Sequence, residues 1–439
     1  MMNSQIFPEN EKISLPPPSR KGFVTNYPPF RQWKSTGEEE ILSGSPINIY
    51  VHIPFCVQRC AYCYYKTSEL KEKKGHLDRY VNAVCREIEL AASRFHLGER
   101  PVESIYFGGG TPSLLKQEQL QKLTEYLHKY LKIGTPEFTV EAEPVTLTQK
   151  KADLLKELGV NRISLGVQSF SDEILAICNR LDNEEKVLKA IAMARGTGAA
   201  VNIDLLSGLA GETFQTWKYS IDRALSAGAE SITVYKMELY ANTDYYKSLR
   251  KKEIVLPSEE DELAFMTYAM EQFGQTQYLP WCFFTFTRNG QYKNIYASSL
   301  WQGIDCYAFG ASGFGSMGNW LYQNTNNDEK YTEVLESGKL PVNRGYHMTS
   351  LDKIIRRVIL GMKLVQFDLK AFQAEFGFRL ESLCSPVLET LAAEGFIAVS
   401  PDWIELTPKG ILYGDYSGKC VAEFFRERFY TDSPLKIYL

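Results

Sequence analysis

Three cysteines stand close together in the stretch YVHIPFCVQRCAYCYY, residues 50–65, at Cys56, Cys60 and Cys63. Thiolates are soft ligands that select iron–sulfur clusters or zinc over hard cations. A [4Fe–4S] cluster usually takes four thiolates, so three would leave one iron open to bind a further molecule. A zinc site with His52 as the fourth ligand is the alternative. His52 belongs to the preceding strand, which would compete with the geometry of such a site, so we favour the cluster.

The composition is that of an ordinary globular chain. Of 439 residues, 44% are hydrophobic and 23% are charged, and the length predicts two or three packed units. The net charge of −4 argues against a nucleic-acid-binding protein. No apolar stretch approaches the roughly 18 residues of a membrane span. The N-terminus lacks a signal-peptide pattern, so we expect the nine cysteines to be reduced thiols, some of them metal ligands, in a cytoplasmic protein.

The elements that must position the cysteines alternate regularly between residues 47 and 240. Short β-branched runs are separated by amphipathic stretches such as LDRYVNAVCREIELAASRF and TFQTWKYSIDRALSAG. Strict alternation predicts a parallel sheet with crossover helices. Six strand–helix units are too few for a closed eight-fold barrel, so we predict an α/β fold with a partial (β/α)6 TIM-like barrel, open on one side. The predicted strands are INIYVHI, SIYFGGG, FTVEAEP, RISLGVQS, VNIDLLSG and SITVYKMEL.

Polar and glycine-rich motifs follow these strands, always at the same end. The cysteines come directly after the first strand, GGGTP follows the second, and EAEP ends the third. GVQSF ends the fourth strand and NIDLLSG the fifth. In folds of this kind, chemistry belongs at the carboxyl ends of the strands. The agreement among the motifs therefore predicts one shared site at that end of the sheet.

The flanking regions are less regular. Residues 1–46 are rich in Pro, Ser and charge, which predicts an irregular arm that lies over the main body and could cover an opening. Residues 241–345 become aromatic and glycine-rich, and we expect them to pack against the open barrel edge. Residues 346–439 predict a mostly helical domain, in which LETLAAEGFIAVSPDWIELTPKGILYG resembles a winged helix. The wing lacks a basic cluster, so a lid or packing role is favoured over DNA binding.

The cysteine spacing, with the aromatic Tyr62 before the last cysteine, resembles the signature of the radical S-adenosylmethionine enzymes. In that family the amino and carboxylate groups of S-adenosylmethionine chelate the open iron. One electron from the cluster then cleaves the sulfonium, giving methionine and a 5′-deoxyadenosyl radical that abstracts hydrogen. Within the superfamily, IYVHIPFC and FGGGTPSLL are similar to the oxygen-independent coproporphyrinogen III oxidases and their relatives, over residues 47–240 and more loosely as far as LTPKG.

The resemblance implies a set of cofactor contacts in this chain. Glycine N–H groups can approach a ligand closely, carboxylates can accept from ribose hydroxyls or an ammonium, and Tyr62 could stack on adenine. The implied S-adenosylmethionine contacts are Tyr50, Tyr62, Gly109, Gly110, Thr111, Glu141, Gln168, Arg180 and Asp204. The family's oxidases bind two S-adenosylmethionines, and GASGFGSMGN places Phe314 at a contact of the second. Glu238 stands where the family has a small residue in that second site.

The resemblance leaves three reactions open. The decarboxylating oxidases carry a further cysteine two residues after the third ligand, where this chain has Tyr65. Haem-trafficking relatives carry a longer motif, of which YKNIYASSLW keeps only Asn294 and Trp301. A third branch transfers one carbon from the second S-adenosylmethionine, in C-methylation or cyclopropanation. We predict one-carbon transfer to an unsaturated small molecule, with tetrapyrrole decarboxylation as the alternative and a haem-binding chaperone as the second alternative.

The sequence also indicates the kinds of partner. The aromatic segment 278–323 could line a pocket for a flat substrate, either aromatic or tetrapyrrole, although a plain aromatic core would explain it equally well. The chemistry implies a small electron donor, a flavodoxin or ferredoxin. We expect no nucleic-acid or membrane partner.

Overall fold

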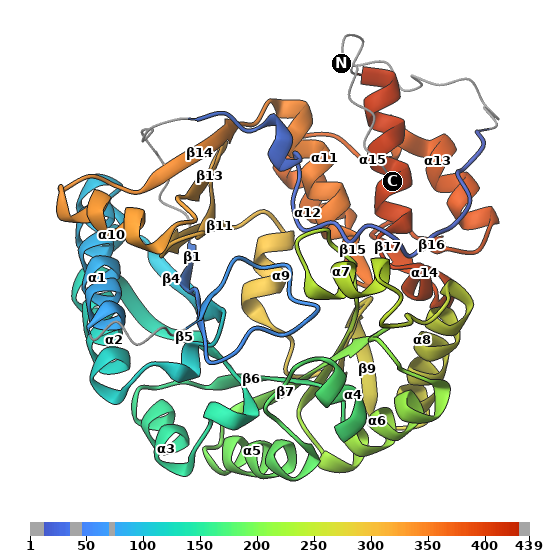
Figure 1. The fold of residues 1–439 in the computed structure, drawn as a ribbon. Coiled ribbons are helices and arrows are strands. Elements are labelled where there is room, and N and C mark those ends of the chain that lie inside the picture. Colours follow the sequence, from blue (N-terminus) through green and yellow to red (C-terminus); the bar gives the residue numbers. More distant parts are fainter. Residues whose placement is uncertain (1–12, 36–45, 70–74, 430–439) are drawn as a thin grey trace.

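Parallel strands form the centre of one large sheet in the computed structural model, which describes residues 13–35, 46–69 and 75–429 (Figure 1). All six predicted strands are present and pair in parallel. A further strand, β11, pairs in parallel with β1 and comes from the aromatic region. In spatial order the parallel strands are β11 (Asp305–Phe309), β1 (Ile47–Ile53), β4 (Pro101–Gly109), β5 (Lys132–Ala142), β6 (Arg162–Gln168), β7 (Ala200–Ser207) and β8 (Ser231–Lys236).

Antiparallel strands from the same aromatic region extend the sheet at both ends. Over the described residues the strand order is linear, with β14 at one edge and β9 at the other, which agrees with the predicted partial barrel. The region 241–345 therefore builds part of the sheet and does not merely pack against its edge. The added strands are β12 (Phe314–Met317), β13 (Trp320–Asn324) and β14 (Val342–His347) beyond β11, and β10 (Thr285–Arg288) and β9 (Tyr278–Cys282) beyond β8.

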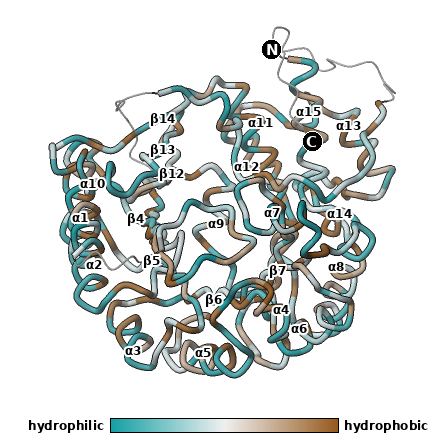
Figure 2. Tube along the Cα trace, viewed as in Figure 1, coloured by the Kyte–Doolittle hydropathy of each residue, from teal (hydrophilic) through white to brown (hydrophobic). Residues whose placement is uncertain are grey.

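Helices cover the outer face of the sheet and turn an apolar stripe toward it. On α1 (His76–Arg94), the buried side chains of Tyr80, Val84 and Ile88 recur every four residues, which marks one helix face. Figure 2 shows hydrophilic and hydrophobic segments in turn along the outer helices. The other helices of this region are α2 (Gln117–Tyr130), α3 (Gln149–Glu157), α4 (Asp172–Ile177), α5 (Glu184–Gly196), α6 (Phe214–Ala227), α7 (Asp244–Arg250), α8 (Glu259–Gly274) and α10 (Asp328–Glu336). One more helix, α9 (Ile295–Trp301), lies inside the ring of strands (Figure 1).

The C-terminal region is mostly helical and carries the predicted wing. A small sheet with the order β15-β17-β16 lies among its helices, and the helix, hairpin and helix expected over 388–414 are present. Its elements are α11 (Ser350–Gly361), β15 (Gln366–Asp368), α12 (Leu369–Phe376), α13 (Glu381–Ala393), β16 (Ile397–Val399), β17 (Trp403–Leu406), α14 (Pro408–Tyr413) and α15 (Tyr416–Phe429).

The described part of the N-terminal arm, residues 13–35, runs between this C-terminal region and the barrel (Figure 1). The Tyr416 hydroxyl donates to the Pro16 carbonyl at 2.7 Å, and Tyr27 and Trp33 are buried. The rest of the predicted arm, residues 1–12 and 36–45, lies outside the described residues. None of the described helices is long and apolar enough to cross a membrane.

Candidate active site

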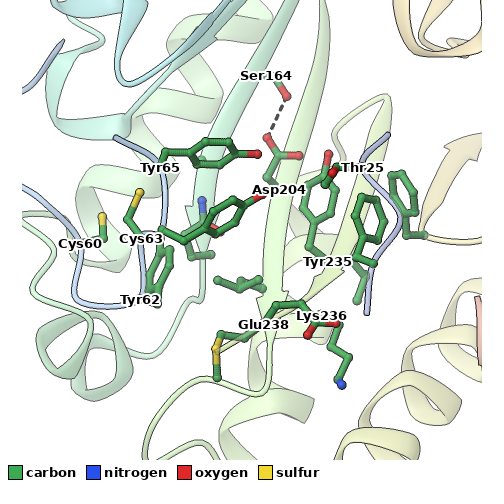
Figure 3. Close-up of a pocket in the computed structure, with 18 of the residues that line it drawn as sticks. Thr25, Cys60, Tyr62, Cys63, Tyr65, Ser164, Asp204, Tyr235, Lys236 and Glu238 are labelled. Atoms are coloured by element: carbon green, nitrogen blue, oxygen red, sulfur yellow. Dashed lines mark hydrogen bonds between the residues drawn. The ribbon is translucent and has the colours of Figure 1, made fainter. Parts of the chain in front are cut away.

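A cavity of about 520 Å³ opens at the carboxyl ends of the parallel strands. Its walls come from the loop after β1, from the ends of β4 to β8, from the arm and from the junction of α14 and α15. Figure 3 shows Cys60 and Cys63 on one side and Thr25 of the arm on the other, with Asp204 and Tyr235 between them. The structure thus brings the strand-end motifs together in one site.

The three cysteines stand on residues 56–63, a segment that begins with the last residue of the short strand β2 (Phe55–Cys56) and that we call the cysteine loop. Cys56 is buried, Cys60 and Cys63 are partly exposed, and all three line the cavity. The Ala61 N–H donates to the Cys178 carbonyl at 2.9 Å, and the Cys63 N–H donates to the Cys60 carbonyl at 3.1 Å. These backbone bonds hold the loop in place independently of any side-chain ligand.

Gly110, from the motif GGGTP, lies directly against the cysteine loop. Its N–H donates to the Ile53 carbonyl at 2.8 Å. A Cβ at this position would lie 2.6 Å from the Phe55 carbonyl oxygen and 3.0 Å from the Cys56 Sγ. Any side chain here would therefore push the loop outward, which explains why this position requires glycine.

The donor set fits an iron–sulfur cluster. Burial raises the pKa of the Cys56 thiol to about 12 and that of Cys63 to about 11, so these thiolates need a bound cation, which cluster iron supplies. His52, the fourth ligand of the alternative zinc site, is instead hydrogen-bonded to Tyr50 at 3.1 Å and lies against Gly109. Within the described chain, no three His, Cys, Asp or Glu side chains are placed to hold a single metal ion.

Arg180 lies beside the cysteine loop and is almost fully buried. Its guanidinium donates to the Gly166 carbonyl at 2.6 Å and pairs with Asp182 at 2.8 Å. It also approaches the Cys60 Sγ at 3.5 Å and the Tyr62 hydroxyl at 3.4 Å. The structure therefore brings Arg180, Tyr62 and a predicted cluster ligand together, although 120 residues separate Cys60 from Arg180.

Two carboxylates, Glu141 and Asp204, line the same cavity. Glu141 accepts hydrogen bonds from the Tyr106 hydroxyl at 2.7 Å and the Gly109 N–H at 3.0 Å. Asp204 accepts from the Ser164 hydroxyl at 2.8 Å, drawn as a dashed line in Figure 3. Burial raises the pKa of Asp204 and raises that of Glu141 to about 7. Glu141 can therefore change its protonation state near neutral pH.

Gln168 reaches the cavity through an irregularity at the end of β6. The register between β6 and β7 shifts between Gly166 and Gln168, and Gln168 has a φ of 67°, in the left-handed region. Such a conformation is strained for a residue other than glycine and is typical of functional sites. The bulge directs the Gln168 side chain into the cavity wall.

Three of the predicted contacts do not line the cavity. Tyr50 is hydrogen-bonded to His52 and stands behind the wall, and the Thr111 hydroxyl is buried beside the side chains of Cys56 and Glu143. Phe314 packs instead against Phe30 and Trp33, with ring centroids 5.5 and 5.2 Å away. The structure thus places Phe314 in an aromatic cluster under the arm, and its contact with a second cofactor stays a prediction.

Several cavity residues were not predicted as site residues from the sequence. They come from the arm, from β8 and from the C-terminal region, and no short motif marks them. Glu238, the departure from the family pattern, accepts a hydrogen bond from the Gly22 N–H at 3.2 Å and so contacts the arm. The unpredicted residues include Arg20, Lys21, Phe23, Tyr235, Lys236, Asp415 and Lys419.

Fold and site together define a partial α/β barrel with a three-cysteine cluster loop at its mouth. The Radical SAM superfamily model matches residues 50–224, and the HemN C-terminal domain model matches residues 348–413. The haem chaperone HemW of Bacillus subtilis is 30% identical over 370 residues, which cover 83% of this chain and 96% of that protein. The oxygen-independent coproporphyrinogen III oxidase of Pseudomonas aeruginosa is 29% identical over 392 residues, 84% of each chain.

Other similarities agree with these. The anaerobilin synthase of Escherichia coli O157:H7 is 28% identical over 297 residues, 67% of this chain and 66% of that protein. The solved coproporphyrinogen III oxidase HemN of Escherichia coli has the same fold, with a TM-score of 0.78 and 24% identity over 92% of this chain and 97% of its own. The chain belongs to the HemN/HemW family of radical S-adenosylmethionine proteins. Its cofactors are a [4Fe–4S] cluster and S-adenosylmethionine.

Proposed function

We propose that this chain is a radical S-adenosylmethionine enzyme that acts on a tetrapyrrole or on another small aromatic or unsaturated molecule. The observation that carries the proposal is the make-up of the cavity, which has three cysteine thiols in one wall and aromatic side chains in the others. The relatives support the substrate class, since they are named for haem, coproporphyrinogen or anaerobilin. The aromatic lining includes Tyr65, Tyr106, Tyr235, Phe283, Tyr296 and Trp301.

The reaction proposed first is the oxidative decarboxylation of a coproporphyrinogen-type substrate. Relatives named as coproporphyrinogen III oxidases align over 84% of this chain in one case and 87% in another. The comparisons therefore favour decarboxylation over the one-carbon transfer that we predicted from the sequence. The proposal includes a flavodoxin or ferredoxin as electron donor, a one-electron acceptor that oxidises the substrate radical as carbon dioxide leaves, and the cytoplasm as the compartment.

The chain's own residues are proposed to hold S-adenosylmethionine beside the cysteine loop. When bound, this cofactor and the cluster supply the hydrogen-abstracting radical. Arg180, fixed by Gly166 and Asp182 next to Cys60, can hold a carboxylate. Glu141 can accept from an ammonium or a ribose hydroxyl, with the Tyr106 hydroxyl fixing its orientation.

One-carbon transfer is the second candidate, and Tyr65 favours it. Tyr65 occupies the position where the resembling oxidases carry a further cysteine, and the structure places it in the cavity wall (Figure 3). This branch would need a second S-adenosylmethionine in the remaining space. A haem-binding chaperone is the non-enzymatic alternative, suggested by the HemW relatives.

The proposed function is tested by an activity assay carried out without oxygen. The reconstituted protein receives reductant, S-adenosylmethionine and coproporphyrinogen III, and mass spectrometry follows the products. Decarboxylated porphyrinogen would support the first proposal. 5′-Deoxyadenosine with untouched porphyrinogen would refute it, and S-adenosylhomocysteine would then point to one-carbon transfer. Stoichiometric haem binding without any 5′-deoxyadenosine would favour the chaperone.

A further inference from the structure

Three tyrosine rings stack on one another along the cavity wall. The ring centroids of Tyr240 and Tyr64 are 4.2 Å apart with the planes 33° apart, and those of Tyr64 and Tyr65 are 4.3 Å apart at 27°. All three rings line the cavity. These distances are those of close aromatic stacking, so we treat Tyr240, Tyr64 and Tyr65 as one unit, the tyrosine stack.

Tyr65 is the inner end of the tyrosine stack. One face of its ring lies on Tyr64, and among the described residues the ring stacks on no other aromatic side chain. The side chain is 52% exposed although it stands in the wall of a cavity. Figure 3 shows Tyr65 pointing from the cysteine loop toward Asp204, across the cavity. One aromatic face is therefore open to the space where a substrate would lie.

Hydrogen bonds from two side chains to backbone carbonyls fix the base of the tyrosine stack. The Asn242 side-chain N–H donates to the Tyr64 carbonyl at 2.8 Å, and the Arg59 guanidinium donates to the Cys63 carbonyl at 2.9 Å. The Tyr64 ring, held on both sides, limits the movement of Tyr65. A ring that is already immobilised loses little conformational entropy when a ligand stacks on it, so its surface is well suited to binding.

We propose that Tyr65 is a stacking platform that takes one pyrrole ring of a tetrapyrrole substrate and sets the substrate beside the cysteine loop. The ring follows Cys63 by two residues, so a molecule lying on it has an edge close to the place where the radical forms. Stacking depends on the ring face and not on the hydroxyl. This inference rests on the proposed function because it takes a tetrapyrrole as the ligand.

Binding of coproporphyrin III, a stable planar porphyrin, tests the platform. The reconstituted protein is titrated anaerobically and the dissociation constant is read from the porphyrin absorbance. Tyr65→Phe keeps the ring and should bind within about twofold of the parent. Tyr65→Leu keeps apolar volume without an aromatic face and should bind at least about tenfold more weakly. Tyr219→Ala is the matched control, because Tyr219 is an exposed tyrosine outside the cavity.

Each outcome has a distinct meaning. Equal binding by the parent and Tyr65→Leu would overturn the platform and leave the proposed substrate class intact. Equal weakening by Tyr65→Phe and Tyr65→Leu would assign the effect to the hydroxyl and also overturn it. No binding by the parent would overturn the platform, while the turnover of coproporphyrinogen III tests the tetrapyrrole proposal separately. The iron content of each variant is measured in parallel and identifies any variant that has lost its cluster. If Tyr65→Leu has lost its cluster, Tyr65→Ala is used in its place.

Discussion

The two facing walls of the cavity are built in different ways. The wall with the cysteine loop comes mainly from consecutive strand ends, with β1, β4 and β5 side by side in the sheet. The opposite wall, which we call the arm wall, is assembled from residues 19–25, the end of β8 and residues 413–419. Its hydrogen bond from the Val24 N–H to Asp415, at 2.8 Å, joins residues 391 positions apart in the chain.

This difference suggests that the two walls of the cavity have different roles. The cysteine wall carries three thiols and a closely packed glycine loop, and this arrangement fits an iron–sulfur cluster. The arm wall depends on a buried ion pair between Lys363 and Asp415, 2.6 Å apart, with the Lys363 ammonium 3.9 Å from the centre of the Phe23 ring. We therefore expect changes in the cysteine wall to remove activity, and changes in the arm wall to alter stability and closure of the cavity.

The largest effect is expected from Cys60→Ala. Loss of one thiolate from the cysteine loop should remove the cluster and all production of 5′-deoxyadenosine. Iron content and product formation measure this directly. Cys85→Ala is the control, since Cys85 is a buried thiol on α1 outside the loop and should leave both unchanged. A Cys60→Ala protein that still cleaves S-adenosylmethionine would refute the assignment of the cysteine wall.

Asp415→Ala should have the next largest effect. Removing the carboxylate leaves Lys363 buried without its partner, which typically costs about 3–5 kcal/mol of stability. The Val24 N–H also loses its acceptor, so the arm should become sensitive to protease. Denaturant unfolding and limited proteolysis measure the two effects. Asp402→Ala, which breaks the exposed Lys370–Asp402 pair, should change neither.

The free energy of unfolding is expected to depend on pH because of a buried carboxylate behind the cysteine wall. Glu87 on α1 accepts hydrogen bonds from the Gly310 N–H, the Asn324 side chain and the Tyr331 hydroxyl, and burial raises its pKa from 4.5 to about 7. Between those values the folded chain holds a proton that the unfolded chain has lost. The stability that Glu87 contributes is therefore complete below about pH 4.5 and is lost as the pH rises through about 7.

Glu87→Gln should flatten this dependence. Unfolding free energies measured between pH 5 and pH 8 should fall more steeply for the parent than for the variant, by about 1–3 kcal/mol over the range. The slope is the readout, since the amide changes the hydrogen bonds at every pH. Parallel slopes would show that Glu87 does not titrate in this range.

The smallest effect is expected from Glu259→Ala. Glu259 pairs with Lys21 of the arm, but both side chains are more than 60% exposed, and exposed pairs contribute little. The unfolding midpoint and the protease resistance of the arm should match those of the parent. A clear loss of arm protection would show that the arm wall depends on surface charge as well as on the buried Lys363–Asp415 pair.

Much of the barrel could be predicted because its signals are local. β-Branched runs alternating with amphipathic stretches identified the six strands. Because parallel strands run in the same direction, the motifs that follow them were expected at one end of the sheet. The strand β11 was missed because DCYAF is short and stands among glycines and aromatics. Parallel pairing of β11 with β1 joins segments more than 250 residues apart, and no local period reports such pairing.

The site, like the barrel, has residues that could be predicted from the sequence and residues that could not. Gly110, Glu141 and Asp204 stand in motifs at strand ends, and Arg180, which follows α4, was implied by the family resemblance. The structure gathers them in one cavity with the three cysteines. Phe314 also stood in a motif, yet it packs under the arm against Trp33. A motif gives the residue type and position but not which neighbour covers the side chain.

The sequence by itself determined the spacing of the three cysteines, the alternation of strands and helices, and the end of the sheet where the polar motifs gather. These depend on residue type and on spacings of a few residues. Only the tertiary structure decided what closes the cavity: the arm, Asp415 with Lys363, and the open face of Tyr65. The physical reason is that burial and stacking arise between segments hundreds of residues apart, whose meeting depends on the packing of the whole chain.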